Sequence, residues 1–350
     1  MAIKLLSDLV TVVSEHISNP STSGFEIFVG LEHYDAGEPV ITRFGSTANL
    51  ESSVKHFIEG DILVARRNVY LKRAGVVKFE GVTSGDSIVL RVKDECYKDI
   101  IPFILNTEEF WDYAEQNSDG TMSKRLAPDV LLEYECDIPD NHMDIAKKLW
   151  AAYELKEAYR KMIAATDEMV KSQFIEMFEF EDLSLLNPSD DFSVKCIDDT
   201  SSATKVPAGE YLGNGTYAIY DQSQDCEVAG YTDSHEGLCN NYPAVLFGDH
   251  SRVVKYINQP FFIGADGVKI IRPKNDDLLA EFLYYDLLYH NIPNTGYNRH
   301  FKYVKMLKLT EASVDRQKAF LGIAHQADKS KFELRQAIDK IDKVMKSLLQ

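Results

Sequence analysis

The hydrophobic and polar positions of this chain form short strand-like runs and long helical stretches. Residues 61–65, 75–79 and 87–93 are runs rich in β-branched and aromatic residues, which predicts strands. The apolar stretch 100–114 has the amphipathic pattern of a helix. We therefore expect the first part of the chain to combine a curved sheet with a helix over residues 100–114.

The same order of elements occurs a second time. The run VLRVK (89–93) has a counterpart in IIRPK (270–274), and an apolar stretch follows each, at 100–114 and 278–290. A polar turn with glycine and a long charged stretch come next in both copies. The copies lie about 170 to 180 residues apart, a much longer period than that of solenoid repeats. The pattern indicates a duplicated globular module, each copy followed by a long helix.

The first long helix is expected over residues 140–180. Neither proline nor glycine occurs between Asn141 and Phe178, and apolar residues recur close to a heptad spacing. A helix of this length is roughly 57 Å long at about 1.5 Å per residue, which suits a spacer. The predicted packing residues are Ile145, Leu149, Ala152, Tyr159, Ile163 and Val170.

The second long helix is expected over residues 310–350, with its phase slipping once near residues 328–331. Its predicted packing residues are Leu321, Ala324, Leu334, Ile338, Ile341 and Met345. Antiparallel packing of the two long helices needs shorter connections than parallel packing, in which a connection would run the full length of a helix. The predicted fold class is therefore α+β: two globular domains (1–139 and 181–309) separated by two long antiparallel coiled-coil helices, with a pseudo-twofold internal repeat.

Composition narrows the class of protein. The chain has 350 residues, of which 45% are hydrophobic and 27% charged, as in globular domains. It has no apolar run long enough to span a bilayer and no signal-peptide pattern, so we expect a cytoplasmic protein without membrane contact. Five cysteines without a CxxC pair predict free thiols, with neither disulfides nor zinc.

The formal net charge of −17 weighs against nucleic-acid binding, because phosphate neutralisation supplies much of that affinity. An acidic chain can still bind DNA if its basic residues cluster on one face, or if a basic partner completes the groove.

The densest basic stretch lies between two predicted strands, at residues 66–73. Arginine can bind guanine, and asparagine adenine, through two hydrogen bonds each, so this loop has base-reading chemistry. The alternative is a solvated surface hairpin. The candidate DNA contacts are Arg66, Arg67, Asn68, Tyr70, Lys72 and Arg73.

Further candidates follow the glycine turn of each copy and the strand-like run 244–247. Those after the glycine turns recur at corresponding places in the two copies, which favours phosphate or base contact over incidental turn charge. Those after the run 244–247 could form a loop that enters the major groove. The candidates are Ser123, Lys124, Arg125, Asn298, Arg299, His300 and Lys302 after the turns, and His250, Ser251, Arg252 and Lys255 after the run.

The sequence contains no pattern typical of catalysis or of a metal site. His235 and Cys239 are four residues apart without a second ligand pair. The run NPSD (187–190) lacks the aromatic residue of an adenine methyltransferase motif, and GNG (213–215) is too short for a phosphate loop. We expect no catalytic residue, no metal and no cofactor in this chain.

Several phrases and their order resemble the specificity subunit of type I restriction–modification systems, over nearly the whole chain. The phrases are GDILVARRN (60–68), TSG (83–85), FWDYA (110–114), NSDGTMS (117–123), GTYAIYD (215–221), AGYT (229–232), FGDHSR (247–252) and FIGADG (262–267).

This resemblance implies a non-catalytic subunit whose two modules, the target recognition domains, each read one half of a split, asymmetric DNA target. It implies that the helices dock two modification subunits, which methylate adenine with S-adenosylmethionine. Restriction subunits would add translocation and cleavage that depend on ATP and Mg.

Three alternatives remain at this stage. One is a standalone or fused DNA methyltransferase, whose motifs are absent. Another is a coiled-coil adaptor that binds proteins alone, which the net acidity favours and the basic loops disfavour. The third is a recognition subunit of a type II-like enzyme with fused methylation and cleavage.

Overall fold

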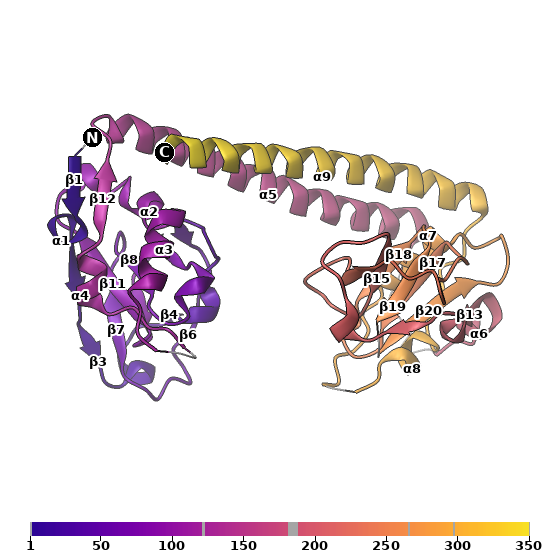
Figure 1. Cartoon of the computed structure of the whole chain (residues 1–350). Coiled ribbons are helices and arrows are strands. Elements are labelled where there is room, and N and C mark those ends of the chain that lie inside the picture. Colours follow the sequence, from indigo (N-terminus) through magenta and orange to yellow (C-terminus); the bar gives the residue numbers. More distant parts are fainter. Residues whose placement is uncertain (1, 121–122, 181–187, 265–266, 297, 350) are drawn as a thin grey trace. The chain divides into compact units, whose positions relative to one another are not determined.

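A computed structural model describes residues 2–120, 123–180, 188–264, 267–296 and 298–349 (Figure 1). It divides into two compact units, the N-terminal unit (Met1–Arg160 with Arg335–Gln350) and the C-terminal unit (Lys161–Leu334). Each unit contains a sheet-rich module and a part of each long helix, which confirms the predicted fold class. Thr121, Met122, Asn187, Ala265 and Asp266 of the sequence phrases above lie outside the described residues.

The main sheet of the N-terminal unit contains the strands predicted from the sequence. Its order is β2 (Val10–Val13), β11 (Ser87–Val92), β8 (Ile62–Ala65), β9 (Ala74–Val77) and β5 (Val40–Ile41). Strand β5 runs parallel to β9, and the other neighbours are antiparallel. A smaller sheet follows the order β3 (His16–Ile17), β7 (Val54–Phe57), β10 (Gly81–Thr83), β4 (Ile27–Val29) and β6 (Gly45–Ser46).

Strand alternation divides the core of this unit between the two faces of the main sheet. Leu63 and Val89 pack with Val29 and Phe57 of the smaller sheet. Ile62, Val64 and Leu90 point to the other face and pack on helices. The strands are therefore buried on both faces, which explains why they appear in the sequence as continuous apolar runs.

The predicted helix over residues 100–114 is wrong, since two helices occupy this stretch. They are α2 (Ile101–Ile104) and α3 (Glu108–Gln116). Between them, the Asn106 side chain donates to the Ala74 carbonyl (2.9 Å), and Thr107 Oγ1 accepts the Phe110 N–H (3.3 Å). Thr107 thus acts as an N-cap that starts a new helix, and Asn106 ties the break to the sheet.

The C-terminal unit repeats much of this topology. One sheet has the order β13 (Cys196–Asp198), β20 (Val268–Pro273), β17 (Ala244–Gly248) and β18 (Val254–Ile257), all antiparallel, matching β2, β11, β8 and β9. The other has the order β14 (Lys205–Val206), β19 (Phe261–Gly264), β15 (Tyr217–Tyr220) and β16 (Gly230–Thr232). Helix α7 (Ala280–Tyr289) covers the first sheet.

The repeated Lys of the sequence has an equivalent role in the two units, and the repeated Arg pairs with an aspartate in each. Arg91 pairs with Asp61 (Nε–Oδ1 2.8 Å), and Arg272 with Asp199 (Nε–Oδ2 2.6 Å). The lysine side chains close the turns before β2 and β13: Lys93 donates to the Ser7 carbonyl (2.7 Å) and Lys274 to the Ser193 carbonyl. The lysines therefore fasten the segment before the first strand of each main sheet, whereas the arginines pair with acids at different places, Asp61 before β8 and Asp199 after β13.

The two long helices are α5 (His142–Phe178) and α9 (Val314–Leu349), which pack antiparallel within each unit. In the C-terminal unit, Lys331 lies opposite Asp167 and Phe320 opposite Phe174. The predicted packing residues Ile145, Leu149, Val170, Leu321, Ala324 and Met345 are buried. Ala152, Tyr159, Ile163, Leu334, Ile338 and Ile341 are partly buried.

The predicted phase slip near residues 328–331 is also wrong. Ala327 is buried, and the Lys331 side chain, 13% exposed, takes the next position on the packing face. The apolar pattern alone misses this continuity because a lysine occupies a position that normally carries a hydrophobic residue.

The stability of the N-terminal unit should depend on pH, because a histidine of the smaller sheet pairs with two carboxylates. His56 contacts Glu15 (Nδ1–Oε2 3.0 Å) and Glu80 (Nε2–Oε1 2.8 Å). Burial lowers the His56 pKa, but the hydrogen bonds with both carboxylates outweigh it, so the pKa lies above its ordinary value of 6.5. The stabilisation is therefore complete below pH 6.5 and is lost as the pH rises through the raised pKa.

Unfolding by urea at pH 5.5 and pH 9 measures this effect in the wild type and in His56→Gln. We expect the variant to lose more stability at pH 5.5 than at pH 9, because the charged histidine contributes only at the lower pH. An equal loss at both pH values would contradict the assignment.

Candidate DNA interface

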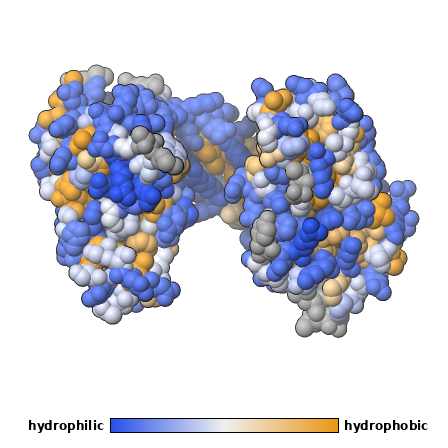
Figure 2. Space-filling model, turned by 60° about the horizontal axis from the view of Figure 1, so that its bottom comes forward, coloured by the Kyte–Doolittle hydropathy of each residue, from blue (hydrophilic) through white to orange (hydrophobic). Residues whose placement is uncertain are grey.

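The two groups of candidate residues in the N-terminal unit form one surface. The β8–β9 loop (residues 66–73) and the segment 123–126 join through backbone bonds, although more than 50 residues separate their contacting groups. The Leu126 N–H donates to the Arg66 carbonyl (2.8 Å), and the Asn68 N–H to the Lys124 carbonyl (2.9 Å). Figure 2 shows a strongly hydrophilic patch on the visible face of this unit.

Side chains reinforce this junction and concentrate positive charge on it. Ser123 Oγ donates to Asn68 Oδ1 and accepts from Arg67 Nε, both at 3.1 Å. Arg67 and Arg125 lie 3.6 and 3.4 Å from the Asp86 carboxylate. Their guanidinium groups remain about half exposed, at 45% and 52% of the side chain, so an incoming phosphate or base edge can compete with Asp86 for them.

Asp86 and Lys55 were missed in the sequence. Asp86 follows the phrase TSG (83–85) in the turn before β11, and that glycine turn was the available signal. Lys55 is in β7, and its Nζ donates to the Ser87 carbonyl (2.8 Å). Burial lowers the Lys55 pKa, and the positive charge of nearby Arg66 lowers it further, which reflects the density of cations here.

The β8–β9 loop has a defined shape. Asn68 (φ 53°) and Lys72 (φ 50°) adopt the left-handed conformation on either side of a 3-10 turn, Val69–Leu71. Val69 is buried, whereas Tyr70 is 57% exposed. Left-handed non-glycine residues are uncommon and persist where the surroundings enforce them. The loop therefore presents Tyr70 from a fixed backbone.

Other candidates in this loop are bound within the unit. Lys72 forms an ion pair with Glu108, and Arg73 donates to the carbonyls of Leu31 (2.9 Å) and Arg67 (3.1 Å). Lys124 donates to the Glu115 carbonyl (2.9 Å). These three cations shape the surface, while Arg67 and Arg125 project more openly from it.

The C-terminal unit joins its candidate segments in the same way. The loop after β17 begins at Asp249, whose carbonyl accepts the His300 N–H (2.8 Å), as the Arg66 carbonyl accepts Leu126 in the other unit. Asp249 Oδ1 also accepts the Phe301 N–H at the start of α8 (Phe301–Val304) at 2.8 Å. Asp249 is buried and was missed in the sequence, although it lies within the phrase FGDHSR (247–252).

Exposure of the candidates differs along this second surface. Asn298, Arg299 and Lys302 are exposed, and His250, Ser251 and Arg252 are partly exposed. Arg252 has a left-handed backbone (φ 63°), and its Nη1 donates to the Ile292 carbonyl (3.0 Å). Tyr220 of β15 is a buried core residue.

The side chains of two predicted DNA-contact residues, Lys255 and His300, face the interior of the unit. Lys255 of β18 is 7% exposed and donates to the Cys226 (2.9 Å) and Glu227 (3.1 Å) carbonyls, because strand alternation directs it inward. His300 is fully buried between the Asp249 carbonyl (Nδ1, 2.9 Å) and the Thr295 N–H (Nε2, 3.2 Å). The buried side chains of Lys255 and His300 are therefore not part of the candidate DNA interface.

The described part of the chain contains no group of three or more His, Cys, Asp or Glu side chains placed to hold a metal ion. All five cysteines lie in it, and all are free thiols. Its helices also lack a segment long and apolar enough to cross a bilayer.

The fold matches that of a solved type I S subunit. The S subunit of the type I restriction–modification system from M. genitalium aligns with a TM-score of 0.52 and 14% identity, over 99% of this chain and 94% of that one. A structure described as the basis of complex assembly and conformational transition of the type I R-M system gives 0.48 (14% identity, 99% and 96% covered). The HsdS subunit from Thermoanaerobacter tengcongensis gives 0.40 (14%, 99% and 95%).

No family model and no curated protein matches the chain. The likeness to the M. genitalium subunit at 14% identity establishes the fold. This chain therefore has the S-subunit fold that the sequence phrases predict.

Proposed function

We propose that this chain is the DNA-recognition subunit of a type I restriction–modification complex. The observation that carries the proposal is the repeated surface. In each unit the hairpin after the equivalent strand, β8 or β17, is joined by its first carbonyl to the segment after the module's helix. Both surfaces present arginine and asparagine or lysine side chains suited to base edges and phosphates.

The two surfaces differ in sequence and shape, so the target should be split and asymmetric. The N-terminal unit presents Tyr70 on a 3-10 turn between Arg67 and Arg73, whereas the loop after β17 is shorter and contains Arg252. Each module would read one half of the target, and substitutions at the exposed positions of the 66–73 and 250–252 loops would alter different halves.

The outer face of α5 supports the docking of partners. Leu155, Met162 and Met169 recur at heptad spacing and are 45%, 52% and 43% exposed. Exposed apolar residues in such a row are typical of a protein interface. The occupants would be the modification subunits, which would supply S-adenosylmethionine chemistry, with ATP and Mg used by restriction subunits. These partners would also offset the net charge of −17 around DNA.

A methylation map of the source genome, with and without this gene, tests the proposal. We expect the loss of an adenine mark at a split, asymmetric motif. An unchanged map in cells that express the partner methyltransferase would favour the protein-only adaptor. The genes next to this one distinguish a type I system from a type II-like fused enzyme.

A further inference from the structure

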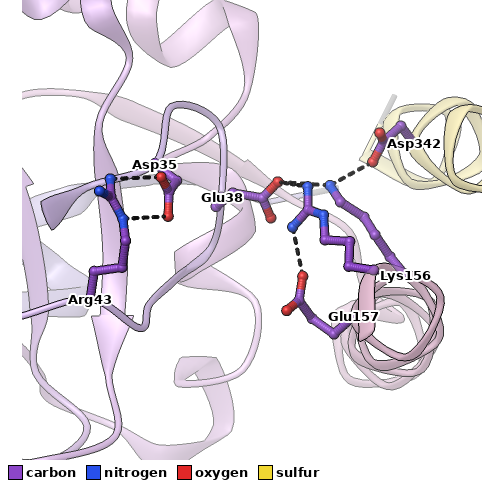
Figure 3. Close-up of polar contacts among 7 residues, drawn as sticks. Asp35, Glu38, Arg43, Lys156, Glu157 and Asp342 are labelled. Carbon is purple, nitrogen blue, oxygen red and sulfur yellow. Dashed lines mark hydrogen bonds and ion pairs between the residues drawn. The ribbon is translucent and has the colours of Figure 1, made fainter. Parts of the chain in front are cut away.

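A buried lysine links the N-terminal module to both long helices. Lys156 of α5 is 5% exposed and lies on the helix-packing face. Its Nζ is 2.8 Å from Asp342 Oδ1 of α9 and 3.0 Å from Glu38 Oε1, which belongs to a loop of the module (Figure 3). One ammonium group therefore joins three segments of the N-terminal unit.

Arg160 strengthens the hold on the same loop. Its Nη2 is 2.6 Å from Glu38 Oε1, and its Nη1 is 2.6 Å from Glu157 Oε1. The loop is fixed on its other side by the pair of Arg43 with Asp35 (2.7 Å), as Figure 3 shows. Glu38 thus receives two cations from α5.

The loop also touches the DNA-reading hairpin directly. The Gly37 N–H donates to the Lys72 carbonyl (2.9 Å), at the left-handed residue that ends the 3-10 turn below Tyr70. A continuous path of polar contacts therefore runs from the hairpin through Gly37 and Glu38 to Lys156 and Asp342.

This cluster is a second attachment point of the module on α5. The first is apolar, where Ile145 and Leu149 pack in the module core. Arg160 lies about 16 Å beyond Leu149 along the helix, at about 1.5 Å per residue. Beside the loop lies a pocket of about 470 Å³, lined in part by Asp35, Glu38 and Arg160. At this point ionic contacts hold the module to the helix. Two separated attachment points prevent a body from pivoting about either one.

The equivalent lysine of the other unit pairs with carboxylates of the two long helices, and one of these, Asp328, accepts from the hydroxyl of Tyr285 on α7 (3.5 Å). Lys331 of α9 pairs with Asp167 of α5 (2.6 Å) and with Asp328 of its own helix (2.8 Å). It therefore offers a matched control for helix pairing without a module loop.

We propose that Glu38, Lys156 and Asp342 form a clamp that fixes the angle of the N-terminal module on its helices, and that this clamp makes the protein selective for one spacer length between the two target halves. The inference rests on the proposed function. A buried ion cluster adds little stability over an apolar replacement, and its best-attested role is to specify one arrangement. Lys156 is in this sense a positioning residue.

The test uses the full chain assembled with its modification subunits, and a DNA pool with randomised half-sites and spacers of different length. We expect the wild type to select one spacer. Glu38→Gln and Lys156→Met should select the same half-site sequences, while their preference for the correct spacer over one a base pair longer falls about tenfold, a difference of about 1.4 kcal/mol. Lys331→Met should keep the wild-type preference.

An unchanged preference in Glu38→Gln would overturn the clamp, and so would an equal loss in Lys331→Met, since helix pairing alone would then set the spacer. Glu38→Gln keeps the shape of a loop residue, so it remains informative if Lys156→Met fails to fold. Failure of the wild type to select any split target would instead reject the proposed function itself.

Discussion

Replacing Arg67 and Arg125 together by alanine should weaken binding of the assembled complex to its target by at least about fivefold per residue. Both guanidinium groups are about half exposed on the surface formed by the β8–β9 loop and the 123–125 segment. An arginine bound to a base edge contributes roughly 1–3 kcal/mol of discrimination. Titrations of the split target at several salt concentrations measure the loss.

The salt dependence tells which contact is made. If the two arginines read bases, selectivity should relax at one half of the target. If they bind phosphates, the slope of log K against log salt should fall by about 0.9 per residue with base preference unchanged. Alanine at Arg299 and Lys302 is the matched pair, and it should affect the opposite half. Unchanged affinity in both double variants would exclude these surfaces from DNA binding.

Phe174→Ala should destabilise the C-terminal unit by about 3–5 kcal/mol. Phe174 of α5 is fully buried where α5, α7 and α9 meet. Its ring centre lies 5.5 Å from that of Phe282 on α7 and 5.2 Å from that of Phe320 on α9. Alanine would leave a cavity among these rings, which rigid helices cannot close.

Denaturant unfolding of the variant measures this loss. Ile175→Ala is the control, because it removes an apolar side chain from the next position of the same helix, where Ile175 is 41% exposed. A surface change of this kind should stay within about 0.5 kcal/mol. Similar losses in the two variants would mean that Phe174 is not the centre of the helix junction.

The elements that the sequence predicts well are those with a local signal. Continuous apolar runs predict β8, β9 and β11, and heptad spacing predicts α5 and α9, since strand and helix periods depend on neighbouring residues. The break at Thr107 was missed because its cap depends on where Asn106 meets the sheet. Lys331 was missed because two carboxylates make a lysine acceptable on the packing face.

The candidate contacts illustrate the same limit. Residues 66–73 and 123–125 could each be chosen by composition, but their meeting through Leu126 and Arg66 depends on the folded sheet. Lys255 and His300 have the same chemistry as the exposed candidates, and only strand direction and the position of Asp249 place them inside. The DNA contacts of the remaining candidates stay predictions.

The joints that hold each candidate surface together are formed by main-chain atoms. The Arg66 carbonyl accepts from the Leu126 N–H, and the Asp249 carbonyl from the His300 N–H. A substitution at an exposed position such as Arg67 or Arg299 leaves these main-chain groups in place. Such surfaces can diversify during evolution, acquiring new preferences by drift in a handful of side chains, while selection for stability acts on a separate set of residues.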